Sequence, residues 1–123
     1  MDIQVSVGNV VLDAELNDTL TARRVAAVLP LDLPFKTWGD EIYFEIPVGA
    51  DLDESAQEEV AVGDLGYWPT GRAFCIFFGP TPMSRDGKII PASAVNMIGR
   101  VTGDVTRLKG VRGTGRILVE AKG

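Results

Sequence analysis

Residues 62–82 read VGDLGYWPTGRAFCIFFGPTP, in which two short apolar runs are joined by a Pro-Thr-Gly turn. The stretch contains three of the five Phe residues and the only Cys, so we expect the hydrophobic core to form around it. If the second run is a strand, its successive side chains point to opposite faces. Each face then carries three apolar residues: Phe74, Ile76 and Phe78 on one, and Ala73, Cys75 and Phe77 on the other.

Apolar residues on both faces need an explanation, because only one face of a barrel strand points into the interior. Two explanations are open for the face of Ala73, Cys75 and Phe77. The first is that this face is covered, by a loop (residues 49–59 or 83–92) or by a partner subunit. The second is that the face is an open apolar groove that binds a ligand.

The length and composition indicate one β-rich domain spanning residues 1–123. A hydrophobic content of 46% with 14 Gly and 7 Pro, beside a single helical stretch, favours a barrel or sandwich with many turns. No run approaches the roughly 18 apolar residues of a membrane span, and an alternating strand directly after Met1 leaves no room for a signal peptide. We therefore expect a cytoplasmic protein, and its single Cys permits no internal disulfide.

The charge balance and the missing residue types exclude several classes of function. A net charge of −5 argues against nucleic acid as a partner, because phosphate binding requires a basic surface. The chain has no His, which excludes zinc sites of the Cys/His kind and hydrolysis by Ser-His-Asp or Cys-His groups. The acidic residues of 49–59 lack the spacing of a calcium loop, so we expect no metal and no other cofactor.

Residue patterns outside the central stretch predict the remaining elements. Alternation predicts a hairpin of residues 3–7 and 10–16 with a tight turn at Gly8-Asn9. An amphipathic helix is expected over 20–29, ended by Pro30, and we expect it to plug one mouth of a barrel. The later elements are a hairpin with its corner at Gly39-Asp40, strands over 41–48 and 94–101, a helical turn over 102–109, a loop over 111–115 and a closing strand over 116–120.

Three segments carry a resemblance to a known family. Residues 65–78 join two apolar runs by a loop rich in Pro and Gly, Asp86-Gly87-Lys88 follows, and residues 98–105 read IGRVTGDV. In this order, the segments resemble the cyclophilins. The pairing of GDLGYWP at 63–69 with FFGPTP at 77–82 is more similar still to the small prokaryotic cyclophilin-like proteins, a group with no assigned function. The resemblance implies a mainly β fold, a closed antiparallel cyclophilin-like barrel with one short α-helix and a helical turn.

Carried over residue by residue, the resemblance does not extend to the cyclophilin catalytic groups. The segment comparable to the one that holds their catalytic Arg is residues 33–38, which contains no Arg. Their Gln corresponds to the segment 42–46, which contains no Gln. Their groove Phe falls at Cys75 and their His at Ile89, so no catalytic residue is assigned.

The expected ligand site is the outer face of the central stretch together with its neighbours. Its expected lining combines two side chains of that face, aromatic residues around them and two polar groups: Cys75, Phe77, Tyr67 or Trp68 from the adjacent strand, Trp38 and Tyr43 from the hairpin that cyclophilins place alongside, and Glu45 and Arg72. We do not expect Cys75 to act as a nucleophile, because no His is present to activate it.

We expect a non-catalytic binding module whose apolar and aromatic groove takes a small molecule or an extended peptide. The sequence is also compatible with a homo-oligomer. The alternative is a divergent peptidyl-prolyl cis-trans isomerase or a peptide chaperone. An isomerase must stabilise charge at the rotating amide, so this alternative requires Lys36 or Arg72 to replace the missing Arg.

Overall fold

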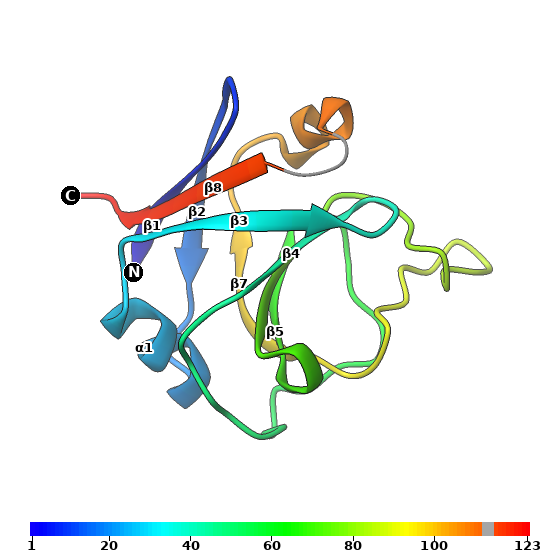
Figure 1. Ribbon diagram of the computed structural model, residues 1–123. Helices are drawn as coiled ribbons and strands as arrows, with labels where there is room; N and C mark the ends of the chain where they lie inside the picture. The colour runs from blue at the N-terminus through cyan, green and yellow to red at the C-terminus, as the bar shows by residue number, and fades with distance from the viewer. Residues whose placement is uncertain (112–114) are drawn as a thin grey trace.

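The computed structural model of the protein describes residues 1–111 and 115–123, and within them eight antiparallel strands close into a barrel (Figure 1). The strands are β1 (Asp2–Val7), β2 (Val10–Leu16), β3 (Leu31–Thr37), β4 (Glu41–Glu45), β5 (Asp64–Trp68), β6 (Ala73–Phe77), β7 (Asn96–Val101) and β8 (Gly115–Ala121). Around the barrel they follow the order β1-β2-β7-β5-β6-β4-β3-β8. The prediction of a mainly β, closed antiparallel barrel is therefore confirmed.

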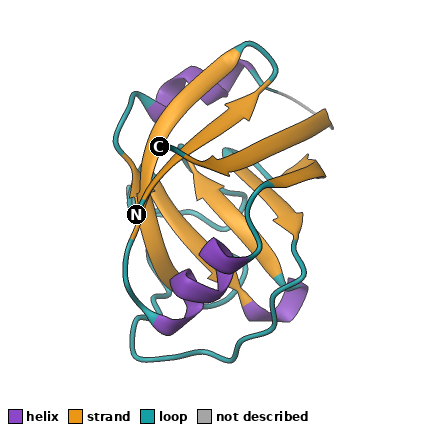
Figure 2. Cartoon of the chain, turned by 90° about the vertical axis from the view of Figure 1, so that its left-hand side faces the viewer, coloured by secondary structure: helices purple, strands orange, loops and turns teal. Residues whose placement is uncertain are grey.

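Helical segments cover the two ends of the barrel, as Figure 2 shows. The α-helix α1 (Leu20–Ala27) adds Ala22 and Val25 to the core, and the 3₁₀ helix η2 (Val105–Gly110) adds Val105 and Leu108 at the opposite end. A shorter 3₁₀ helix, η1 (Pro69–Gly71), joins β5 to β6. No helix in the described residues is long and apolar enough to cross a membrane.

Several element boundaries differ from the sequence-based expectation. Helix α1 ends at Ala27, two residues before the expected end. Leu29 precedes Pro30, and the residue before a proline is disfavoured in the helical conformation. Strand β4 ends at Glu45, because the next backbone N–H, that of Ile46, donates instead to the carbonyl of Arg72 at 2.9 Å. The expected loop over 111–115 lies partly outside the described residues.

Thr19 caps the N-terminus of α1, because its Oγ1 accepts a hydrogen bond from the backbone N–H of Ala22 at 3.2 Å. The change Thr19→Ala leaves this N–H without its partner and is expected to lower the free energy of unfolding by about 1 kcal/mol. Urea denaturation followed by circular dichroism measures the loss. The control Thr102→Ala alters an exposed Thr outside the helix, and an equal effect of the two changes would contradict the capping role.

The barrel interior is filled by the inward face of each strand, as period-two alternation requires. Phe44 and Phe74 stack there with ring centroids 5.1 Å apart. Tyr67 also points inward and is fully buried, and its hydroxyl donates to the carbonyl of Val48 at 2.5 Å. Tyr67 is therefore a core residue with a satisfied hydroxyl.

The outer face of β6 is covered by the chain itself. Its side chains Ala73, Cys75 and Phe77 are buried in a second apolar cluster, to which the segments around them add Val60, Ile89 and Val95. The two covering segments are bonded to each other, since the N–H of Val60 donates to the carbonyl of Ile89 at 3.0 Å. Of the two explanations open for this face, a cover by the chain is the one observed: Ile89 lies in the expected loop 83–92, and Val60 and Val95 lie outside both expected loops.

A buried network of hydrogen bonds holds residues 49–59, the acidic segment that follows β4. Asn96 of β7 is fully buried, and its amide Nδ2 donates to the carbonyl of Asp51 at 2.9 Å and to Oγ1 of Thr21 at 3.1 Å. Its Oδ1 accepts from the backbone N–H of Asp53 at 2.9 Å. The carboxylate of Asp53 in turn accepts hydrogen bonds from Ser55 and Thr21. The segment is thus fixed to both α1 and β7.

Candidate functional site

A pocket of about 250 Å³ opens on the outer side of the barrel beside β4. Its lining residues come from the β3–β4 turn, from β4 and β5, and from the segment before β7: Trp38, Glu41, Tyr43, Trp68 and Ala92. Glu41 and Tyr43 share the outer face of β4 because they are two residues apart. They pair across the strands with Phe77 and Cys75. The pocket therefore lies against the buried outer face of β6.

The turn that places Trp38 and Glu41 is held in position on both sides. Within the turn, the N–H of Trp38 donates to the carbonyl of Glu41 at 2.9 Å. Gly39 at its corner has a φ of 60°, and a Cβ there would lie 2.9 Å from backbone atoms of Pro80 and Thr81. Only glycine fits this corner, so the sequence fixes the direction in which Trp38 enters the pocket.

Trp68 is oriented by a hydrogen bond and by a missing side chain. Its indole Nε1 donates to Oγ of Ser93 at 2.6 Å, which ties the ring to the segment before β7. A Cβ on Gly71 would lie 2.6 Å from the six-membered ring of Trp68. The indole therefore occupies space that exists only because residue 71 is glycine.

Glu41 is the unusual group of the pocket. The residue is only 5% exposed. Its Oε1 is the one buried side-chain nitrogen or oxygen without a hydrogen-bond partner among residues 1–111 and 115–123. Burial raises the pKa of the carboxyl from 4.5 to about 7, and a hydrogen bond from the Cys75 thiol acts in the opposite direction. The carboxyl therefore changes its charge near neutral pH.

Cys75 lies beneath the pocket. It is fully buried, and burial, together with the nearby charge of Glu41, raises the pKa of its thiol. A thiol held in this protonated form is a poor nucleophile. Among the residues that line the pocket, Glu41 is left as the group able to gain or lose a proton near neutral pH, and the surrounding walls are aromatic.

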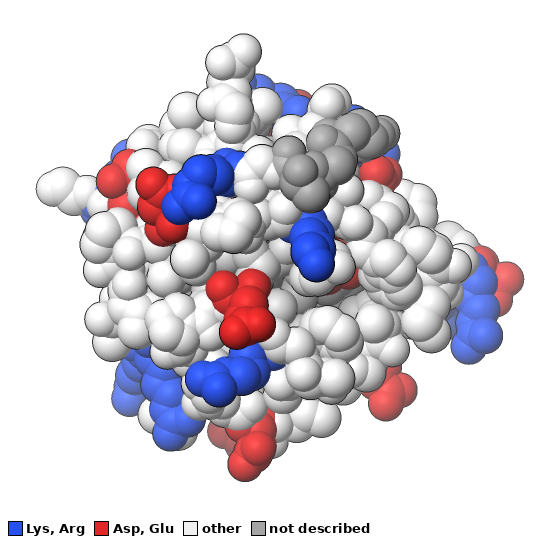
Figure 3. Space-filling view, in the orientation of Figure 1, with Lys and Arg blue, Asp and Glu red and all other residues white. Residues whose placement is uncertain are grey.

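A second hollow of about 360 Å³ continues from the pocket and shares Tyr43 and Trp68 with it. It forms where β3 leaves β4, since the two strands pair only at Lys36–Tyr43 and Thr37–Ile42 before β3 turns to β8. Lys36 and Glu45 line this hollow. Figure 3 shows the face over β3 and β4, which is mostly uncharged and carries a few acidic and basic side chains, some of them side by side.

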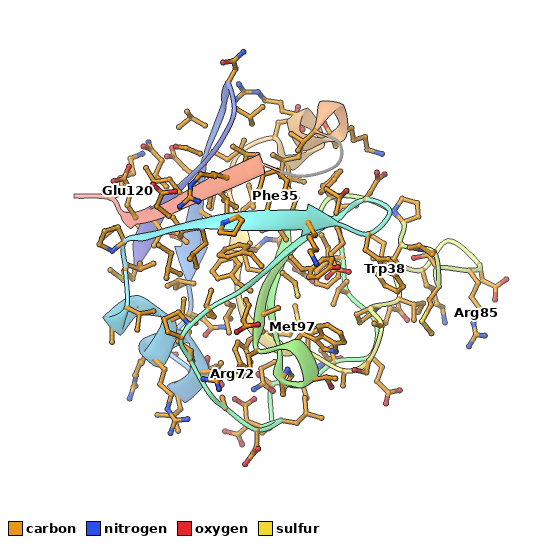
Figure 4. All side chains as sticks on the ribbon, in the orientation of Figure 1. Phe35, Trp38, Arg72, Arg85, Met97 and Glu120 are labelled. Atoms are coloured by element: carbon orange, nitrogen blue, oxygen red, sulfur yellow. The ribbon has the colours of Figure 1, made fainter. Side chains whose placement is uncertain are left out.

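The structure brings together only part of the site expected from the sequence. Trp38, Tyr43 and Trp68 line the pocket, and Glu45 lines the adjoining hollow. Cys75 and Phe77 are buried beneath it, and Tyr67 points into the barrel interior. Arg72 takes a left-handed conformation at the end of η1 and lines neither hollow, and Figure 4 shows it well apart from Trp38.

Sequence reasoning missed Glu41. The signal was available, because the alternation that assigns Tyr43 and Glu45 to one face of a strand places Glu41 on the same face. A carboxylate in an alternating strand is normally exposed, so nothing in the pattern distinguished it from a solvated residue.

Comparisons with known proteins agree with the barrel. The family model described as Cyclophilin-like matches residues 1–120. The chain is also similar to the hypothetical protein AF2241 from Archaeoglobus fulgidus, whose solution structure superposes with a TM-score of 0.82. The two sequences are 38% identical, and the match covers 99% of this chain and 95% of the archaeal one. A search among curated proteins found no match. The chain belongs to the cyclophilin-like family.

Proposed function

We propose that the protein is a non-catalytic binding module that takes a small molecule or an extended peptide in the pocket beside β4. The observation that carries the proposal is the state of the three aromatic side chains Trp38, Tyr43 and Trp68. They remain partly exposed around one concavity, while the outer face of β6 is covered by other segments of the chain. Concave sites with apolar walls and few polar groups are the usual form of ligand pockets.

The adjoining hollow supports an extended ligand. It runs on from Tyr43 and Trp68 and adds the charged groups Lys36 and Glu45 at its edge. A ligand that entered the pocket with one group could lie along this hollow with the rest of its length. The two volumes together, about 250 and 360 Å³, fall in the range of sites for small organic ligands.

The alternative, a divergent prolyl isomerase, depends on a cation near the rotating amide. Lys36 lines the adjoining hollow and is the candidate for this role, whereas Arg72 lines neither hollow. A protease-coupled assay on proline peptides separates the two functions. If the unchanged protein turns over proline peptides and Lys36→Ala abolishes that turnover, the isomerase function is supported and the non-catalytic one is contradicted.

Tryptophan fluorescence reports on the pocket directly, because both Trp residues of the chain line it. Titration with a panel of metabolites and short peptides is expected to give a saturable change in emission, accompanied by a rise in thermal stability. The change Tyr43→Ala removes one aromatic wall without removing a fluorophore. It is expected to weaken binding by about tenfold, as truncation of a central aromatic contact does.

The control for this experiment is Leu20→Ala, which shortens an exposed side chain on α1. Binding to the control variant should equal binding to the unchanged protein. A ligand that raises thermal stability without altering the emission, or that binds the Tyr43→Ala variant undiminished, would place the binding surface elsewhere and contradict the proposal.

A further inference from the structure

We infer, on the basis of the binding function proposed above, that the pocket takes an alkylammonium group, a protonated primary amine on a short aliphatic chain, with Glu41 as its acceptor. The inference rests on the buried unpaired oxygen of Glu41, on the aromatic walls beside it and on the charge of the surroundings.

One oxygen of the buried Glu41 carboxyl lacks a partner, although the Cys75 thiol donates a hydrogen bond to the carboxyl. Its Oε1 accepts no hydrogen bond. In the described part of the chain, no Lys or Arg forms an ion pair with its carboxyl. A buried acceptor without a donor is destabilising, and a buried charge without a counter-charge is more so. An ammonium N–H entering from the pocket supplies both the donor and the positive charge.

The walls of the pocket suit a cation. The faces of Trp and Tyr rings carry negative partial charge and attract an ammonium group that lies within about 6 Å of the ring centre. Trp38, Tyr43 and Trp68 surround the same concavity as Glu41. The arrangement therefore combines an aromatic enclosure with a carboxylate, two features that each favour positive charge.

Other ligand chemistries fit less well. An anion would meet the Glu41 carboxyl, and none of the residues lining the pocket is basic. The net charge of −5 also favours the approach of cations over anions. A neutral alcohol or amide could donate a hydrogen bond to Oε1, but it would gain neither the ion pair nor the attraction to the rings.

The size of the pocket limits the group that enters. About 250 Å³ lies below the range of about 300–1,000 Å³ for sites that hold drug-sized ligands, which favours a short aliphatic chain. The adjoining hollow allows such a chain to be part of something longer. The ammonium group can thus come from a free amine or from the side chain of a lysyl peptide, and the experiment distinguishes these sources.

Binding of a cation should depend on pH, because it favours the ionised form of Glu41. The titratable groups that face this carboxyl are Tyr43 from its own strand and Cys75 from β6. Burial raises the pKa of the Cys75 thiol. With a pKa of about 7 for Glu41, affinity for an alkylammonium ion is expected to be about tenfold higher at about pH 8 than at about pH 6.

The test is a tryptophan-fluorescence titration with four probes: butylammonium, Nα-acetyl-lysine N-methylamide, butan-1-ol and butyrate. Butylammonium should give a saturable change that strengthens with pH, and butan-1-ol and butyrate should give none at the same concentrations. Tighter binding of the lysine derivative than of butylammonium assigns the ammonium group to a peptide, and the reverse order assigns it to a free amine. Absence of a butylammonium response at both pH values overturns the inference.

Variants of β4 supply the second readout. Glu41→Gln keeps the shape and removes the charge, and it is expected to weaken butylammonium binding by about tenfold at about pH 8 and to abolish the pH dependence. The matched control lies outside β4: Glu58→Gln alters an exposed carboxylate that lines neither hollow, and it should leave the affinity within about twofold. Binding that Glu41→Gln leaves unchanged overturns the inference. If the variant does not fold, the pH dependence of the unchanged protein decides in its place.

Failure of this inference and failure of the proposed function give different results. If butylammonium has no effect while neutral compounds or proline peptides change the emission, the ammonium assignment is wrong and the binding function stands. If no compound of either panel changes the emission, the binding function at this pocket is wrong as well.

Discussion

Replacing Asn96 with alanine is expected to lower the free energy of unfolding by about 3 kcal/mol. The fully buried Asn96 side chain makes three hydrogen bonds, and its loss leaves the carbonyl of Asp51 and the N–H of Asp53 without partners. Each unsatisfied group of this kind costs about 1–3 kcal/mol, reduced here where solvent can reach the segment.

Thermal and urea unfolding monitored by circular dichroism measure this loss, which corresponds to a fall in Tm of about 10 °C for a domain of this size. The matched control is Asn9→Ala, in the exposed β1–β2 turn, which should change stability by less than about 0.5 kcal/mol. Similar effects of the two changes would show that Asn96 does not hold the acidic segment.

Replacing Glu41 with glutamine is expected to stabilise the protein at alkaline pH by about 3 kcal/mol and to leave it unchanged in acid. The carboxyl of Glu41 has a pKa of 4.5 when unperturbed and about 7 in the folded protein, where burial disfavours the charge. Below the lower value, both folded and unfolded chains hold the proton, and the carboxyl carries no penalty. As pH rises from about 4.5 to about 7, the unfolded chain ionises first and stability is lost.

The difference in unfolding free energy between the Glu41→Gln variant and the unchanged protein isolates the contribution of Glu41 ionisation, because the other carboxyls contribute equally to both proteins. That control is needed, since the pKa of Asp53 is lowered: burial raises it, but hydrogen bonds from Ser55 and Thr21 outweigh burial. Asp53 therefore loses its stabilising contribution as pH falls. A difference that stays flat from acid to alkaline pH would mean that Glu41 is not buried as described.

The two faces of β6 show how much of the fold could be predicted from the sequence. Alternation alone assigned Phe74 and Ile76 to one face and Cys75 and Phe77 to the other, and both assignments hold in the barrel. Apolar residues on the outer face required a cover or a ligand. Alternation within β6 does not tell which, because the covering residues Val60, Ile89 and Val95 belong to other segments of the chain.

Tyr67 and Trp68 show where alternation stops. Adjacent residues of a strand point to opposite faces, so one of the two had to be inside. With apolar residues on both faces, the sequence offers no preference, and the choice is made by the register that pairs Trp68 with Ala73. Arg72 lines neither hollow for a related reason: it closes the η1 turn in a left-handed conformation, which the strand pattern does not reveal.

The pocket itself depends on contacts between segments far apart in the chain. The turn that carries Trp38 and Glu41 meets Ala92 only once the strand order of the barrel is set. The family resemblance placed the hairpin that carries Trp38 and Tyr43 beside the central stretch, so these two residues could be named from it. The burial of Glu41 arises from the packing of aromatic residues around it, and no local pattern encodes this.

The most direct test is a pH titration of the Glu41 carboxyl group, monitored by the NMR chemical shift of its carbon. The titration is carried out on the free protein and again with butylammonium present. We expect a midpoint at about pH 7 in the free protein, because the carboxyl is buried and its Oε1 has no hydrogen-bond partner, and a lower midpoint when the ammonium ion is bound. A free midpoint at the ordinary value of 4.5, unmoved by butylammonium, would contradict this expectation.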